Sequence, residues 1–115
     1  MQPVVQFRLR ITRGEDIALG PGKIRLLEAI AETGSISSAA RKLDMSYRRA
    51  WDLVDEMNRS LEQPVVETAI GGTRGGGTVV TESGRRVIEL YRRIEEEARA
   101  GAAKSLASLT RMLLQ

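Results

Sequence analysis

The stretch from Gly34 to Leu61, GSISSAARKLDMSYRRAWDLVDEMNRSL, constrains the fold more than any other part of the chain. It predicts two helices, over residues 35–43 and 46–61, and each begins with a serine that can cap the free N–H groups of the helix start. The turn between them is so short that the helices must cross sharply. Ala39 and Ala40 have the small side chains that a close crossing needs. This combination is typical of a helix-turn-helix.

The second of these helices has two distinct faces. Its apolar residues recur at spacings of three and four and form one stripe: Ala50, Leu53, Val54, Met57 and Leu61. The other face is polar, and a helix-turn-helix places the start of its second helix against base edges in the major groove. Arginine there can bond guanine bidentately or hold a phosphate. A solvated basic face is the alternative, but the turn, the small residues and the arginines together favour DNA contact.

The candidate DNA-binding residues of the helix pair follow from these positions. On the second helix they are Ser46, Tyr47, Arg48, Arg49 and Asp52. At the start of the first helix, Ser37 and Ser38 are candidate phosphate contacts, because free N–H groups there favour anions. For Trp51, at the edge of the apolar stripe, we expect packing in preference to base stacking.

Composition narrows the class of protein. The 115 residues include no cysteine and no histidine, so disulfides, thiolate metal sites and the usual general base are all missing. We therefore expect no enzyme, no metal and no cofactor. No apolar run reaches membrane-spanning length and the N-terminus lacks a signal-peptide core, which predicts a cytoplasmic protein. The net charge of +3 is small, but basic residues gather in the helix pair, where the proposed DNA face would lie.

The N-terminal third supports the helix pair. Residues 5–12 alternate apolar and polar side chains, which predicts a strand, with Arg8 and Arg10 on a solvated face in preference to a phosphate contact. A turn at residues 14–16 follows. Pro21 suits the first turn of a helix that Gly34 ends.

A hairpin is expected directly after the helix pair. Residues 65–69 and 78–80 predict two short strands, and the glycine-rich sequence GGTRGGG lies between them at 71–77. A hairpin in this place is the wing of a winged helix. Thr73 and Arg74 at its tip are candidate contacts to phosphate or the minor groove. A hairpin without any DNA contact is the alternative.

The last part of the chain predicts one helix over residues 82–113, about 45 Å long. Apolar and small side chains form a seam resembling a heptad repeat, with these candidate dimerisation residues: Val87, Tyr91, Ile94, Ala98, Leu106 and Leu109. Gly101 weakens the helix locally and is a candidate bend. We expect a DNA-binding domain over 1–80 and a dimerisation helix over 81–115; folding of the second half back onto the domain is the alternative.

With these residues placed, the chain resembles the N-terminal DNA-binding domain of the molybdate-responsive, ModE-type transcriptional regulators. Two segments carry the resemblance, GSISSAARKLDMSYRRAWDLVDEMN and GGTRGGGTVVTESGRRVIELYRRIEEE, and GSISSAARKL alone is also similar to LysR-type regulators. The resemblance implies a mainly α winged helix-turn-helix with a small β hairpin and a dimer formed through the helix after the wing. It also implies binding to a palindromic operator. Members of that family carry C-terminal oxyanion-binding domains, for which we expect no room here.

Three functions stay open on the sequence alone. The first is a homodimeric, sequence-specific transcriptional regulator that binds double-stranded DNA. The second is a protein–protein interaction module, suggested by the acidic Asp52, Asp55 and Glu56 on the polar face of the second helix. The third is a regulator that responds to a molybdate-like oxyanion but lacks its own sensor domain.

Overall fold

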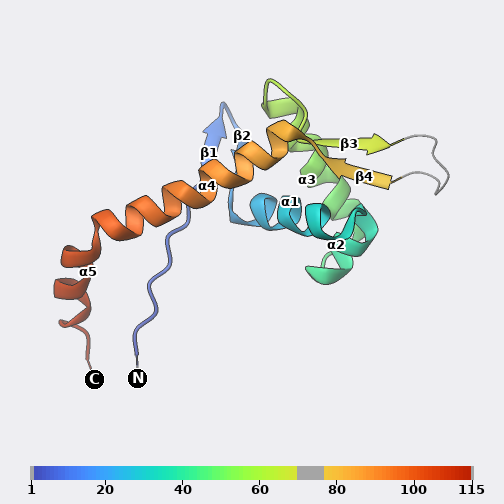
Figure 1. Cartoon of the computed structure of the whole chain (residues 1–115). Helices are drawn as coiled ribbons and strands as arrows, with labels where there is room; N and C mark the ends of the chain where they lie inside the picture. Colours follow the sequence, from blue (N-terminus) through green and yellow to red (C-terminus); the bar gives the residue numbers. More distant parts are fainter. Residues whose placement is uncertain (1, 70–76, 115) are drawn as a thin grey trace.

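The computed structural model describes residues 2–69 and 77–114, and Figure 1 shows the arrangement of their helices and strands. Five helices and two short antiparallel hairpins follow one another in the order β1, β2, α1, α2, α3, β3, β4, α4, α5. The predicted fold class, a mainly α winged helix-turn-helix with a small hairpin, is confirmed. The elements are β1 Ile11–Arg13, β2 Asp16–Leu19, α1 Pro21–Thr33, α2 Ile36–Lys42, α3 Tyr47–Ser60, β3 Val66–Ala69, β4 Gly77–Val80, α4 Glu82–Gly101 and α5 Ala103–Thr110.

The helix-turn-helix consists of α2 and α3, and both predicted caps are present. The Ser35 hydroxyl accepts a hydrogen bond from the Ser38 N–H at 3.1 Å, and the Ser46 hydroxyl accepts one from the Arg49 N–H at 3.0 Å. The turn between the helices depends on Asp44, whose φ of 59° is in the left-handed region. Aspartate tolerates that conformation better than most residues, which lets the chain turn within the four residues between α2 and α3.

The core lies where α1, α2, α3 and the base of the wing meet. Ala39 and Ala40 are buried at the helix crossing, and the apolar stripe of α3 is buried from Ala50 to Met57. Ile24, Leu27 and Ile30 of α1 fill the centre of the core. One charged side chain, Lys23, is also buried. Its ammonium group pairs with Glu56 of α3 at 3.1 Å and donates to the Ile17 carbonyl, so it links three elements.

The wing strands β3 and β4 are held to the helices at their base. They pair in the register Val66 with Val80, and Ala69 with Gly77. Asn58 joins them to α3, because its amide donates to the Val66 carbonyl at 3.1 Å and accepts from the Val65 N–H at 2.8 Å. Thr81 caps α4 as predicted, and its hydroxyl also donates to the Pro64 carbonyl at 2.6 Å.

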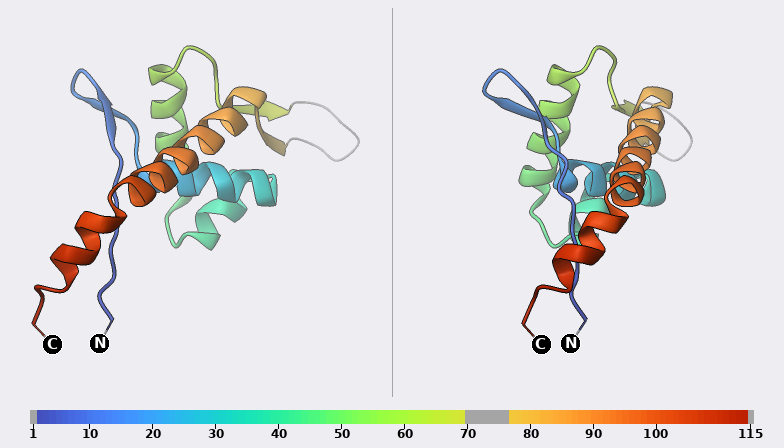
Figure 2. Two further views of the ribbon diagram at one scale, coloured as in Figure 1. Left: turned by 60° about the vertical axis from the view of Figure 1, so that its left-hand side comes forward. Right: turned by 90° about the vertical axis from the view of Figure 1, so that its left-hand side faces the viewer.

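The predicted strand over residues 5–12 is wrong for most of its length. Only Ile11–Arg13 forms a strand, because it pairs with β2, which the sequence reading missed. Residues 2–10 have no regular structure and run beside α4 (Figure 2). The Tyr91 hydroxyl of α4 donates to the Leu9 carbonyl at 2.6 Å and thereby fixes this segment. This segment lies against a helix, so it has no neighbouring strand to pair with, although its alternating pattern is typical of a strand.

The predicted single helix over 82–113 is also wrong, because the chain breaks at Ala102 into α4 and α5. The break follows Gly101, the residue expected to weaken the helix. The predicted seam divides as well. Val87 packs against the core and Tyr91 is 2% exposed, so Tyr91 belongs to its own domain and is not available to a partner. Ile94, Ala98 and Leu109 are exposed, whereas Leu106 is half-buried.

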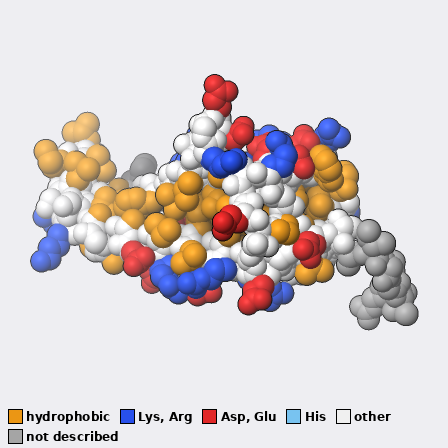
Figure 3. Space-filling model, turned by 90° about the horizontal axis from the view of Figure 1, so that it is seen from above, with side chains coloured by type: hydrophobic (Ala, Val, Ile, Leu, Met, Phe, Trp, Pro, Cys, Tyr) orange, Lys and Arg blue, Asp and Glu red, His pale blue; other side chains and the backbone are white. Residues whose placement is uncertain are grey.

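A hydrophobic surface extends along the end of the molecule that α4 and α5 form (Figure 3). Leu90, Ile94 and Leu109 are its exposed large side chains on these two helices, and Met112, Leu113 and Leu114 follow beyond α5. On the opposite side, Arg92 ties α4 to α1 through Glu28 at 2.6 Å and to Glu95 at 2.7 Å. The hydrogen bonds that Arg92 donates to these two carboxylates raise its pKa, so that it stays charged.

None of the described helices combines the length and the apolar character that a membrane crossing requires. Over residues 2–69 and 77–114, no cluster of three or more carboxylates forms a metal site.

Candidate nucleic-acid interface

The start of α3 presents its polar side chains to solvent. Ser46, Tyr47, Arg48 and Arg49 are all exposed, and the Arg48 side chain is 81% exposed. Their positions follow from the helix cap at Ser46 and from the burial of Ala50, which turn the first exposed turn of α3 outward. This end of the helix can therefore enter a groove of the duplex without rearrangement of the core.

Arg48 is held in place by two neighbours on its own helix. Its Nε lies 3.3 Å from an oxygen of Asp52, and its guanidinium lies 5.5 Å from the centre of the Trp51 ring. An exposed ion pair of this kind contributes about 0–1 kcal/mol to stability, so it orients the guanidinium more than it stabilises the fold. An arginine whose position is set before binding loses less conformational entropy when it meets a base.

A groove joins the helix-turn-helix to the wing. Its volume is about 310 Å³, and it is lined by Gly34, Ser35, Ile36, Ser37, Tyr47, Trp51, Thr68, Gly77 and Thr78. The Thr78 N–H donates to the Gly34 carbonyl at 3.1 Å and fixes β4 against the start of α2. Hydroxyl groups from both wing strands and two aromatic rings therefore line the groove beside the start of α3.

The predicted contact residues fall into separate groups. Ser37 and Tyr47 line the groove, and Arg48 stands over Trp51 at its edge. Ser38 is half-buried and its N–H is already bonded to Ser35, so it is less accessible than Ser37. Arg49 lies on the other flank of α3, in a hollow that Arg10 and Glu56 also line.

Thr73 and Arg74, the predicted wing-tip contacts, lie outside the described residues.

Trp51, Thr68 and Thr78 are residues of this groove that sequence reasoning missed. Trp51 is 42% exposed, so it is less buried than the predicted packing role requires. Its position four residues after Tyr47 was the available signal, because that spacing places both rings on one helix face. The two threonines had no such signal, since a strand pattern alone does not say which face meets the helices.

A sequence profile of the lysR family of bacterial regulatory helix-turn-helix proteins matches residues 22–85, which include α1, both helices of the motif and the wing strands. The chain belongs to this family. The matched range includes every residue that lines the groove.

Two relatives are similar to this chain over about four fifths of its residues. The DNA-binding transcriptional dual regulator ModE of Escherichia coli K12 is 49% identical over 91 residues, which are 79% of this chain and 34% of that protein. The molybdenum transport protein ModE of Azotobacter vinelandii is 44% identical, over 80% of this chain and 35% of that protein. The chain thus spans about a third of the length of the relatives it matches, and its predicted resemblance to the ModE-type DNA-binding domain is confirmed.

Solved structures share the fold. The crystal structure of a CbnR DBD–DNA complex superposes with a TM-score of 0.57 at 25% identity, covering 76% of this chain and 95% of that chain. The Staphylococcus aureus MepR F27L mutant bound to an oligodeoxyribonucleotide gives a TM-score of 0.54 at 18% identity, covering 79% of this chain and 72% of that chain. The second likeness concerns the fold alone.

Proposed function

We propose that this chain is the DNA-binding part of a transcriptional regulator and that it inserts the start of α3 into the major groove. The observation that carries the proposal is the outward-facing first turn of α3, with Arg48 oriented by Asp52 and Trp51 beside the groove of the wing. Arg48 has the geometry to bond a guanine edge, and Asp52 serves by orienting it. Ser37, Ser46 and Tyr47 fit contacts to the phosphates that flank those bases.

Other predicted contacts take secondary roles in this proposal. Arg49, on the other flank of α3, suits a phosphate of the opposite strand, and Ser38 supports the start of α2. For Thr73 and Arg74 we keep the role expected from the sequence, which is contact with phosphate or with the minor groove. The base of the wing is bonded to α3, because the Asn58 amide donates to the Val66 carbonyl and accepts from the Val65 N–H.

The test is the substitution Arg48→Ala with Arg59→Ala as a matched control. Both arginines are exposed residues of α3 that pair with an aspartate four residues away, Arg59 with Asp55 at 2.9 Å, but Arg59 lies at the other end of the helix. We expect Arg48→Ala to weaken binding to a selected operator by about 1–3 kcal/mol and to relax base preference at one position. Arg59→Ala should leave both unchanged.

Fluorescence anisotropy of the operator and of a scrambled duplex gives the readout. Equal losses for Arg48→Ala on both duplexes, with a flatter salt dependence, would assign Arg48 to a phosphate. An unchanged affinity of Arg48→Ala for both duplexes would remove the start of α3 from the interface and overturn the proposal.

We further propose a homodimer, with residues 1–80 as the DNA-binding unit and residues 81–115 as the dimerisation unit. Support comes from the exposed apolar side chains Leu90, Ile94 and Leu109, which have no cover in the single chain. Two copies would place their recognition helices about 34 Å apart, or a small multiple of that distance, on a palindromic operator.

The interaction-module alternative loses its main support, because Asp52 and Asp55 are paired with Arg48 and Arg59 instead of standing free. A regulator that responds to a molybdate-like oxyanion stays the second candidate, since the relatives are named for molybdenum. Equilibrium dialysis of the chain with molybdate tests whether these residues sense it: uptake would place the sensor within them, and the absence of uptake would exclude them.

A further inference from the structure

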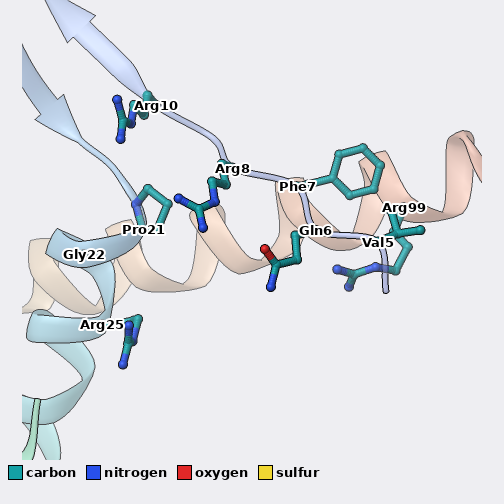
Figure 4. Close-up of a pocket in the computed structure, with 9 residues that line it drawn as sticks. All are labelled: Val5, Gln6, Phe7, Arg8, Arg10, Pro21, Gly22, Arg25 and Arg99. Carbon is teal, nitrogen blue, oxygen red and sulfur yellow. The ribbon is translucent and has the colours of Figure 1, made fainter. Parts of the chain in front are cut away.

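A second basic region lies away from the start of α3, in a cavity of about 430 Å³ between the N-terminal segment, the start of α1 and the end of α4 (Figure 4). Four arginines line it: Arg8, Arg10, Arg25 and Arg99. The other lining residues are uncharged, so the cavity wall contains no carboxylate. We propose that this cavity binds a polyanion of the phosphate type.

The four arginines have no carboxylate partner in the described part of the chain, a property that they share with Arg13, Arg41, Arg49, Arg85 and Arg111. Arg48, Arg59, Arg86, Arg92 and Arg93 each have an ion pair within 4.0 Å, whereas these four have none among residues 2–69 and 77–114. Like charges gathered around one cavity repel each other, and a bound anion would offset that repulsion. All four arginines are exposed to solvent, so a phosphate group can reach them without rearrangement of the chain.

Two contacts hold the N-terminal segment against α4 at the cavity wall. The Leu9 carbonyl, between Arg8 and Arg10, accepts the hydrogen bond from the Tyr91 hydroxyl, which anchors that segment to α4. The Arg99 guanidinium lies 5.9 Å from the centre of the Phe7 ring. Figure 4 shows Arg8 and Arg10 reaching from the N-terminal segment toward Pro21 at the start of α1.

The start of α1 adds to the positive potential of the cavity. Its N-cap, Gly20, provides no side-chain hydrogen bond, and its first turn contains no acidic residue. The free N–H groups of a helix start attract anions, and here they adjoin the arginine side chains. Guanidinium groups bind phosphate oxygens through paired hydrogen bonds, so phosphate groups are the chemistry that fits this lining best.

Two sources can supply such groups, a small free polyanion or the DNA backbone beyond the operator. Arg10, Pro21 and Gly22 also line the hollow that contains Arg49, so the cavity continues toward the recognition helix. A free polyanion would bridge the N-terminal segment, α1 and α4.

The sharpest test uses Gly22, where a Cβ would meet no atom within 4 Å and the backbone φ is not in the left-handed region. Gly22→Asp places a carboxylate in the cavity, and Gly22→Asn is its neutral control of the same size. Both side chains suit the first turn of a helix, so thermal melts should show both variants folded. Arg85→Gln, on α4 outside the cavity, controls for the loss of one exposed arginine.

The readout is a titration of the full chain with pyrophosphate, followed by the backbone and arginine Nε signals in nuclear magnetic resonance spectra. We expect saturable shifts around Gly22, Arg8 and Arg25. Gly22→Asp should weaken the affinity by roughly tenfold or more, whereas Gly22→Asn and Arg85→Gln leave it within about twofold. Non-saturating shifts, or equal affinities in all four proteins, would overturn the proposal.

A second pair of measurements identifies the source of the anion. The two Gly22 variants are compared on a short operator duplex and on one extended by about one helical turn at each end. A loss for Gly22→Asp on the long duplex alone supports DNA backbone as the ligand. Equal affinity on both duplexes, together with lost pyrophosphate binding, supports a free anion. The pyrophosphate titration does not require DNA binding, so it can succeed where the proposed function fails.

Discussion

At the scale of single residues, Tyr91 illustrates what periodicity predicts and what it misses. Its spacing from Val87 and Ile94 placed it correctly on the apolar face of the last helix. Periodicity does not say what covers that face. Tyr91 is covered by an earlier part of the same chain, since its hydroxyl donates to the carbonyl of Leu9, 82 residues before it. Arg48 was easier to predict, because an exposed helix start depends only on local capping and on the apolar stripe. The contacts of Arg48 with Asp52 and Trp51 could not be predicted from the sequence, because they depend on side-chain conformation.

Tyr91→Phe should lower the free energy of unfolding by about 1–3 kcal/mol, because the Leu9 carbonyl loses its donor. Tyr47→Phe is the matched control, since that ring is 54% exposed, and it should change stability by less than about 0.5 kcal/mol. Urea unfolding at neutral pH measures both. Equal stabilities of the two variants would mean that the Tyr91 hydroxyl has no structural role.

The same residue predicts a pH dependence. Burial, and after it the Glu95 carboxylate, raise the pKa of Tyr91 above 10.0, against the opposing effect of Arg92. The folded chain thus favours the neutral hydroxyl, so its contribution is complete below about pH 10 and falls as pH rises through the folded pKa. The stability difference between wild type and Tyr91→Phe should therefore shrink only as the pH rises above about 10. A constant difference above that pH would contradict this assignment.

At the scale of elements, the helices with local signals were predictable and the strands that depend on partners were not. Caps at Ser35, Ser46 and Thr81 set the starts of three helices within one residue of their predicted positions. The left-handed Gly34 ended α1 as expected. By contrast, β2 carries no strong alternating pattern, and it exists because β1 lies beside it. The residues that line the four-arginine cavity come from three parts of the chain distant in sequence, which no local pattern can bring together.

Two glycines of α4 give opposite predictions for the same substitution. A Cβ on Gly84 would lie 2.3 Å from the Val65 carbonyl oxygen and 2.7 Å from Val80, so Gly84→Ala must push α4 away from the base of the wing. We expect a loss of about 1–3 kcal/mol or more. Gly101→Ala meets nothing within 4 Å and should raise stability by up to about 1 kcal/mol, through helix propensity. Thermal melts compare the two variants, and an increase of the melting temperature for both would refute the close packing at Gly84.

At the scale of the whole molecule, the chain is longer than a compact domain of its size. Its radius of gyration is 17.2 Å and its extents are 58 × 30 × 24 Å, whereas about 13 Å is usual for this length. The excess comes from the end of α4 and from α5, which extend beyond the core (Figure 1). Sequence reasoning predicted that overhang from helix length, although it expected one straight helix in place of two.

Ile94→Asp should convert the proposed dimer into a monomer, because it places a charge on the exposed apolar face, 43% accessible in the single chain. Sedimentation equilibrium measures the mass, and operator affinity should fall together with it. Glu96→Lys, an exposed charge change two residues along α4, is the control and should leave the mass unchanged. A wild-type chain that sediments as a monomer at all concentrations, with full operator affinity, would refute dimerisation through this face.

The bond between Tyr91 and Leu9 also determines when the domain can finish folding during synthesis. The helix pair consists of contacts close in sequence, and such contacts form early. The N-terminal segment, although made first, has no partner until Tyr91 has left the ribosome. At translation rates of roughly 5–20 residues per second, that wait lasts several seconds. During this interval Leu9 and the underside of α1 are exposed to other nascent chains and to chaperones.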